Sequence, residues 1–188
     1  MTDIAKSRIL IIATDGFEQS ELEVPRDTLR KAGATVDVAS PDGKAITGWD
    51  MKDWGRKADV DLRIADVDPG NYTALVIPGG VINPDKLRVD EDAMAVVNEF
   101  LASGKIVAAV CHGPWLLVQA DALRGRRATS YKSIRKDVEN AGAHWVDEEV
   151  VADNGVITSR NPDDLKAFTA KIIEEIGEGR HPIREAAE

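Results

Sequence analysis

The chain has a single cysteine, and it stands where a reactive thiol is expected. Cys111 follows the apolar run 106–110, typical of a buried strand, and precedes Gly113 and Pro114, which favour a sharp turn and a helix start. This strand-to-helix turn resembles a nucleophile elbow, which holds a side chain exposed at the edge of a sheet. A helix N-terminus would also favour the thiolate. We predict that Cys111 is a nucleophile, the alternative being a small buried apolar side chain.

Two ionisable residues could move protons at this thiol. On a sharp turn the imidazole of His112 can act as a general base beside Cys111, although neighbours on an ordinary strand point apart. Glu18 opens the helix that follows the first strand, which we expect near the centre of the sheet. A carboxyl group buried beside a thiolate would be protonated and could donate a hydrogen bond to sulfur. The alternatives are a structural histidine and a carboxylate that only favours the helix start.

A glycine pair follows another apolar strand and could bind an oxyanion. Gly79 and Gly80 come directly after the run 72–77 and Pro78. Backbone N–H groups without side chains around them could stabilise the oxyanion formed when the thiolate attacks a carbonyl group. A tight turn is the alternative interpretation.

The elements that must position these residues alternate along the chain. Apolar or alternating runs predict strands, and period-3.6 patterns closed by Gly or Pro predict helices between them. Expected strands cover 8–13, 35–39, 72–77, 106–110, about 127–130, 145–146, 149–152 and 156–159, and expected helices cover about 18–32, 90–103, 115–122, 133–140 and 162–176. This order predicts one α/β domain over residues 1–188, with a mainly parallel sheet covered on both faces. Residues 44–71, with Trp49 and Trp54, predict short strands or a hairpin, and residues 177–188 a loose tail.

Composition excludes several classes of function. The net charge of −9 leaves no basic surface for nucleic acid. No apolar run approaches the roughly 20 residues that span a bilayer, and no signal peptide is evident at the start, so we expect a cytoplasmic protein without a membrane partner. One cysteine excludes an internal disulfide, and three histidines without ligand spacing indicate neither a metal site nor a cofactor.

A set of motifs resembles the PfpI family of intracellular cysteine hydrolases, within the ThiJ/PfpI superfamily. The motifs are DGFEQSELEVP, ALVIPGG, INPDKLR, VAAVCHGP, LRGRRATSY, NAGAHWVDEEVV and TSRNPDDL. They occur in the family's order from Ile9 to about Ile173. The set is specific, although no single piece would be.

The resemblance implies a fold and an active site. The family has a flavodoxin-like three-layer sandwich with a nucleophile elbow, similar to class I glutamine amidotransferases. Carried over by position, Cys111 would be the nucleophile, His112 its base and Glu18 the carboxyl group that contacts the thiol. The N–H groups of Gly80 and His112 would form the oxyanion hole.

The resemblance also implies a homodimer or a higher homo-oligomer with a shared active site. In peptidase-like members a glutamate in the loop after PGG reaches the active-site histidine of the neighbouring subunit. The matching residue here is Asp85, one methylene shorter. We expect Asp85 to accept a hydrogen bond from His112 of the other subunit if the backbone is close enough.

Three functions fit these residues. The first is a stress-protective cysteine hydrolase that acts on peptides, on α-oxoaldehyde-modified (glycated) proteins or on small aldehydes. The second is a redox-sensing stress protein or chaperone whose Cys111 is oxidised without turnover, which would need neither His112 nor Asp85. A glutamine amidotransferase ranks last, because the chain has no His-x-Glu motif.

Overall fold

Seven strands form the main sheet of the protein. The computed structural model describes residues 3–179. The strands are β1 (Arg8–Ile12), β2 (Thr35–Ser40), β5 (Leu62–Arg63), β6 (Ala74–Ile77), β7 (Ile106–Val110), β10 (Val150–Asp153) and β11 (Val156–Ser159). Their order is β10-β11-β7-β6-β1-β2-β5, and only the β10–β11 pair of this sheet is antiparallel. The predicted α/β fold with a mainly parallel sheet is therefore confirmed.

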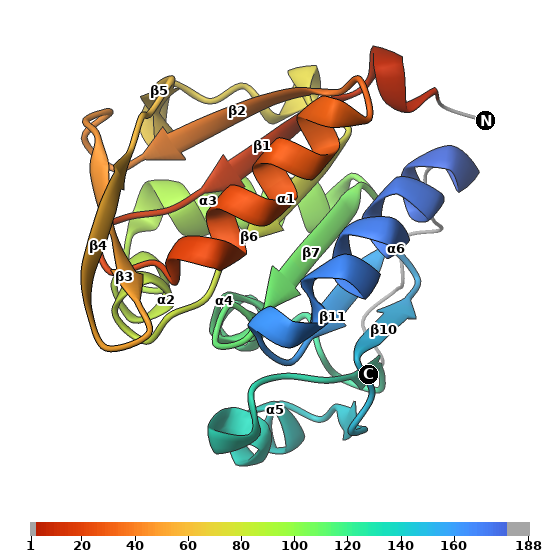
Figure 1. Ribbon diagram of the computed structural model, residues 1–188. Coiled ribbons are helices and arrows are strands. Elements are labelled where there is room, and N and C mark those ends of the chain that lie inside the picture. Colours follow the sequence, from red (N-terminus) through yellow and green to blue (C-terminus); the bar gives the residue numbers. More distant parts are fainter. Residues whose placement is uncertain (1–2, 180–188) are drawn as a thin grey trace.

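Helices cover both faces of this sheet (Figure 1). The long helices α1 (Gln19–Lys31) and α6 (Leu165–Glu178) pack on one face, and α3 (Glu91–Ala102), α4 (Pro114–Gln119) and α5 (Arg135–Asn140) pack on the other. Short 3-10 turns occupy Ile4–Lys6, Ile64–Asp66, Pro69–Asn71, Lys132–Ile134 and Pro162–Asp164. The arrangement is a three-layer sandwich of the flavodoxin-like type.

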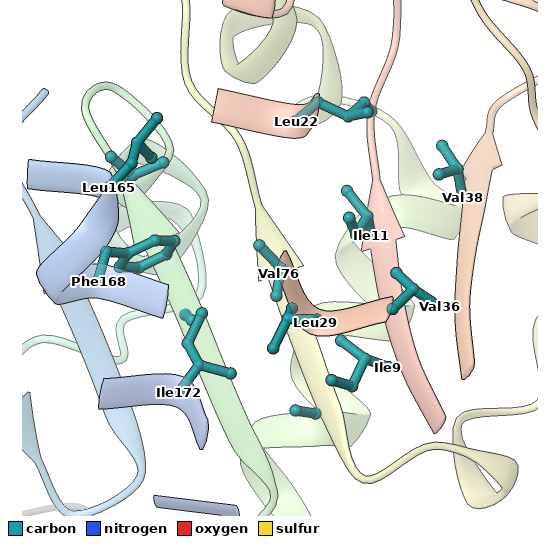
Figure 2. Close-up of a cluster of buried hydrophobic side chains, with 14 of the residues drawn as sticks. Ile9, Ile11, Leu22, Leu29, Val36, Val38, Val76, Leu165, Phe168 and Ile172 are labelled. Carbon is teal, nitrogen blue, oxygen red and sulfur yellow. The ribbon is translucent and has the colours of Figure 1, made fainter. Parts of the chain in front are cut away.

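The strands contain continuous apolar runs because helices cover both faces of the sheet. In β1, Ile9 and Ile11 belong to the core on the side of α1 and α6, whereas Leu10 and Ile12 belong to the core on the side of α3. Figure 2 shows Ile9 and Ile11 near Leu29 of α1. Because alternate residues of a strand face opposite sides, a strand buried on both faces shows no polar alternation.

A hairpin follows β2 and lies against the loop after β1. Strands β3 (Ile46–Asp50) and β4 (Asp53–Ala58) pair in antiparallel fashion, which confirms the hairpin predicted within residues 44–71. Two backbone bonds tie the hairpin to the loop after β1, from Gly16 N to Thr47 O (2.9 Å) and from Trp49 N to Phe17 O (2.7 Å). A further parallel pair joins β8 (Arg127–Ala128) to β9 (His144–Trp145).

One helix was not expected from the sequence. Residues 79–85 read as a loop, but α2 (Ile82–Leu87) begins within this stretch. Its buried Asn83 accepts a hydrogen bond from Thr14 N (2.7 Å) and donates one to Pro78 O (2.9 Å). These contacts link two loops that are far apart in sequence, so local patterns carry no sign of them.

The last helix of the described chain ends slightly later than predicted, at Glu178. Residues 180–188 of the expected tail lie outside the described part. Among residues 3–179, no helix is long and apolar enough to cross a membrane.

Candidate active site

Cys111 stands on a strained turn between β7 and α4. Its φ angle of 63° lies in the left-handed region, which costs a residue with a Cβ roughly 1–2 kcal/mol. The surrounding backbone fixes this conformation, because Cys111 N donates to Ser159 O (3.0 Å) and Tyr131 N donates to Cys111 O (2.8 Å). The nucleophile elbow expected from the sequence is present.

Two glycines allow the chain to pass close to this turn. A Cβ atom on Gly113 would lie 2.6 Å from Ile77 O, and one on Gly79 would lie 2.7 Å from Cys111 Cβ. Real Cβ atoms do not approach other atoms so closely. Glycine at both positions therefore permits the end of β6 to lie directly beside the elbow.

The carboxyl group at the thiol belongs to Glu21, so the prediction that Glu18 contacts the thiol is wrong. Glu21 is fully buried, and its carboxyl group accepts a hydrogen bond from Gly79 N (Oε2, 2.8 Å) and interacts with the Cys111 thiol. Glu18 only precedes α1, whereas Glu21 lies on the buried face of that helix with Leu22. A charged residue on the apolar stripe of a helix is the sequence signal that could have identified Glu21.

The thiol and this carboxyl group both resist ionisation. Burial raises the pKa of Glu21 to about 8, against the opposing effect of the Gly79 hydrogen bond, so Glu21 is mostly protonated at pH 7. Burial, and the charge of Glu21 when that residue ionises, raise the pKa of Cys111, while N–H groups of Gly80 and His112 oppose the rise. The predicted preference for thiolate is therefore wrong: Cys111 is only 6% exposed, and α4 has only six residues.

His112 is placed to remove the thiol proton. Its Nδ1 lies 3.2 Å from Cys111 Sγ, and burial lowers the pKa of the imidazole, so the neutral form that can accept a proton predominates at pH 7. The ring stacks on Tyr131, with centroids 4.9 Å apart, and meets the edge of Trp115. These contacts hold the base against the thiol.

The other ring nitrogen of His112 has a partner that the sequence did not reveal. Ser133 Oγ lies 3.0 Å from Nε2. When Nδ1 accepts the thiol proton, Nε2 carries a hydrogen and donates it to this hydroxyl. Asp85 lies exposed on α2 and does not line the cavity described below, so its contact with a second subunit stays a prediction.

We expect Ser133→Ala to shift the pH dependence of Cys111 alkylation by iodoacetamide and to slow the reaction a few-fold at pH 7. The variant removes the acceptor that selects the Nε2–H tautomer of His112, worth about 1 kcal/mol for one hydrogen bond. The measurement is the second-order rate constant between pH 5 and 10, with Ser133→Thr as the variant that keeps the hydroxyl. An unchanged profile in Ser133→Ala beside an altered one in Asp85→Asn would assign the role to Asp85.

The predicted oxyanion donors are only partly available. The N–H groups of Gly80 and His112 lie at the sulfur, where they could stabilise negative charge. Gly79 N already donates to Glu21, so its expected role in binding an oxyanion is corrected. Gly79 instead positions the carboxyl group that contacts the thiol.

The elbow opens into a cavity of about 580 Å³ at the carboxyl ends of the strands. Its wall combines the β3–β4 hairpin, the loop after β6 and the segment after β8. The lining residues are Gly16, Glu18, Glu21, Trp49, Met51, Gly80, Val81, Ile82, Cys111, His112, Tyr131, Ser133 and Pro162. Trp54, which is half-exposed, packs edge-on against Trp49 with ring centroids 5.7 Å apart. A mostly apolar pocket around a buried nucleophile can exclude water from a reacting carbonyl group.

Known proteins are similar to this chain in sequence and in fold. The chain matches the DJ-1/PfpI family over residues 7–175. It is 42% identical over 166 residues to Deglycase TK1284 of Thermococcus kodakarensis, covering 88% of this chain and 97% of that protein. It is also 42% identical over 172 residues to Protein/nucleic acid deglycase 2 of Escherichia coli, covering 90% of this chain and 98% of that protein.

A solved structure is also similar to this chain in fold. The crystal structure of Drosophila melanogaster DJ-1beta superposes with a TM-score of 0.83 at 29% identity, covering 91% of this chain and 90% of that one. The sequence and the fold therefore point to the same family. The chain belongs to the DJ-1/PfpI family.

Proposed function

We propose that the protein is a cysteine-dependent hydrolase that acts on α-oxoaldehyde-modified (glycated) proteins or on peptides, with a protective role under stress. The observation that supports this most is the contact between Cys111 Sγ and His112 Nδ1 (3.2 Å) inside the substrate-sized cavity. The names of the two deglycase relatives favour glycated substrates. A homodimer or higher homo-oligomer, with Asp85 at the neighbouring site, belongs to the same proposal.

In this proposal the thiol becomes a nucleophile during the reaction. His112 removes the thiol proton as sulfur bonds to the carbon of the adduct or peptide, and the Gly80 and His112 N–H groups face developing negative charge. The bond from that carbon to the leaving nitrogen breaks, and the imidazolium returns the proton to nitrogen. Water then cleaves the sulfur–carbon bond and regenerates the thiol. A neutral thiol–imidazole pair suits the raised pKa of Cys111 and the lowered pKa of His112.

The test is turnover of methylglyoxal, a methylglyoxal-modified peptide, a methylglyoxal-modified guanine nucleotide and an unmodified peptide. We expect wild type to turn over the modified or unmodified peptide and Cys111→Ala to lose the activity entirely. The measurement is product formation by mass spectrometry. Activity that survives in Cys111→Ala would contradict the proposal, and turnover of the nucleotide alone would place the substrate outside the proposed class.

The redox-sensing alternative rests on the same sulfur. Glu21, mostly protonated at pH 7, could donate a hydrogen bond to a cysteine sulfinate. A sensor has no need of His112 beside the thiol, whereas a hydrolase does. Peroxide-driven conversion of Cys111 to a sulfinate, together with no turnover of any substrate above, would favour the sensor.

A further inference from the structure

Glu18 has a fixed position in the cavity but no role in the chemistry described above. Its backbone N–H donates to Gly79 O (3.2 Å), and the residue forms an isolated parallel bridge with Trp49. These contacts join Glu18 to the loop after β6 on one side and to the hairpin on the other. The half-buried side chain lines the cavity that contains Cys111.

The side chain of Glu18 does not cap α1. No hydrogen bond runs from the helix N–H groups to this carboxylate, although Glu18 occupies the cap position. Burial raises the pKa of the Glu18 carboxyl group above its ordinary value, and the Met51 N–H and the Ser20 hydroxyl oppose that rise. The interpretation of Glu18 as a residue that only favours the helix start is therefore insufficient.

No positive charge within the described chain neutralises Glu18. Residues 3–179 form no ion pair with it, and the cavity lining contains neither lysine nor arginine. Asp50 adds further negative charge nearby. By contrast Glu23, which does not line the cavity, pairs with Arg56 at 2.5 Å.

A second carboxyl group in the same cavity is incompletely paired. Glu21 is fully buried, and its Oε1 has no hydrogen-bond partner by geometry among the described residues. The cavity thus offers the Glu18 carboxyl group, the mostly protonated carboxyl group of Glu21, apolar walls and the neutral imidazole of His112, but neither lysine nor arginine. Such a lining favours a ligand that carries positive charge and disfavours an anion.

We propose that Glu18 forms a subsite for a cationic group of the substrate, a guanidinium or an ammonium group next to the bond that Cys111 attacks. This inference rests on the proposed function and adds its substrate class: peptides or adducts that keep a positive charge close to the reacting carbon. The apolar walls formed by Trp49 and Met51 would contact the aliphatic part of such a side chain.

The subsite can be tested without turnover, by labelling Cys111 with three methanethiosulfonates of similar size. Their ethyl groups carry trimethylammonium, hydroxyl or sulfonate. The thiolate attacks the sulfenyl sulfur of the reagent, a mixed disulfide forms, and methanesulfinate leaves with the electron pair of the broken sulfur–sulfur bond. Because all three reagents report on the same thiolate, ratios of their rate constants cancel any change in the pKa of Cys111.

In wild type we expect the cationic reagent to react faster than the neutral one, and the anionic reagent to react slowest. Glu18→Gln should lower the cation-to-neutral ratio on the order of tenfold, the effect of one charge pair across a partly screened pocket. Glu23→Gln, in the helix that follows Glu18 but outside the cavity lining, should keep the wild-type ratio. A ratio unchanged in Glu18→Gln would overturn the proposal.

A turnover experiment separates this inference from the proposed function. Two methylglyoxal-modified peptides are compared, one with arginine and one with citrulline next to the modified residue. Preference for the arginine peptide that Glu18→Gln removes supports the subsite, and equal turnover of both overturns it as a determinant of specificity. If neither peptide is turned over, and the unmodified peptide is not turned over either, the hydrolase proposal fails, and the labelling ratios alone decide whether the cationic subsite exists.

Discussion

Glu21→Gln should move the pH at which Cys111 becomes reactive toward iodoacetamide down by about one unit or more, a tenfold change in the ratio of thiolate to thiol. The charge that Glu21 gains as it ionises, with a pKa of about 8, raises the pKa of Cys111. Glutamine has nearly the same shape and can still accept the Gly79 hydrogen bond, but it never becomes negative. The measurement is the second-order alkylation rate constant between pH 5 and 10.

Glu23→Gln is the matched control for this experiment, because Glu23 lies on the same helix and pairs with Arg56 outside the cavity. It should leave the profile of Cys111 alkylation unchanged. A Glu21→Gln profile that coincides with wild type would show that the two groups do not interact, and a shift to higher pH would show that the carboxylic acid chiefly stabilises thiolate.

The raised pKa of Glu21 also makes the free energy of unfolding depend on pH in a defined direction. Burial raises the pKa of Glu21 from 4.5 to about 8, so between these values the unfolded chain loses a proton that the folded protein keeps. This group therefore lowers the free energy of unfolding as pH rises through that window, by up to about 1.4 kcal/mol per pH unit. Urea unfolding at pH 5 and pH 8 should show this loss in wild type and a smaller loss in Glu21→Gln.

His112→Gln should lower turnover by about 10²-fold or more if the protein is the proposed hydrolase, the usual contribution of a general base. Because the pKa of Cys111 is raised, little thiolate is present at pH 7, and attack requires the imidazole 3.2 Å away to remove the proton. The expected signature is a loss in kcat that shrinks as pH rises, since hydroxide then forms the thiolate without help.

Circular dichroism and thermal unfolding should first establish that the His112→Gln protein is folded, because the imidazole also stacks on Tyr131. Tyr131→Phe provides a second comparison, since it keeps the stacked ring beside His112. Turnover in His112→Gln equal to wild type at pH 7 would exclude the imidazole as the base. It would also favour a thiol that ionises before the substrate binds.

The sequence predicted the fold class and the location of the nucleophile. Both depend on local patterns: continuous apolar runs mark strands buried on two faces, and the glycine and proline after Cys111 mark a sharp turn into a helix. The position of Cys111 at the elbow, with φ of 63°, agrees with that pattern. The predicted proximity of His112 to the thiol also holds, because adjacent residues on a sharp turn can approach each other.

Only the tertiary structure decided which carboxyl group and which hydroxyl group complete the site. Glu18 and Glu21 are three residues apart, and the choice depends on where α1 begins and on how its buried face meets the elbow. Ser133 reaches His112 Nε2 across 21 residues of sequence, in a contact that local patterns do not encode. The ionisation of Cys111 depends on burial, which sums contributions from distant strands and loops. The sequence therefore determined where a thiol could react, and the packing of distant segments around it decided its proton partners and its charge.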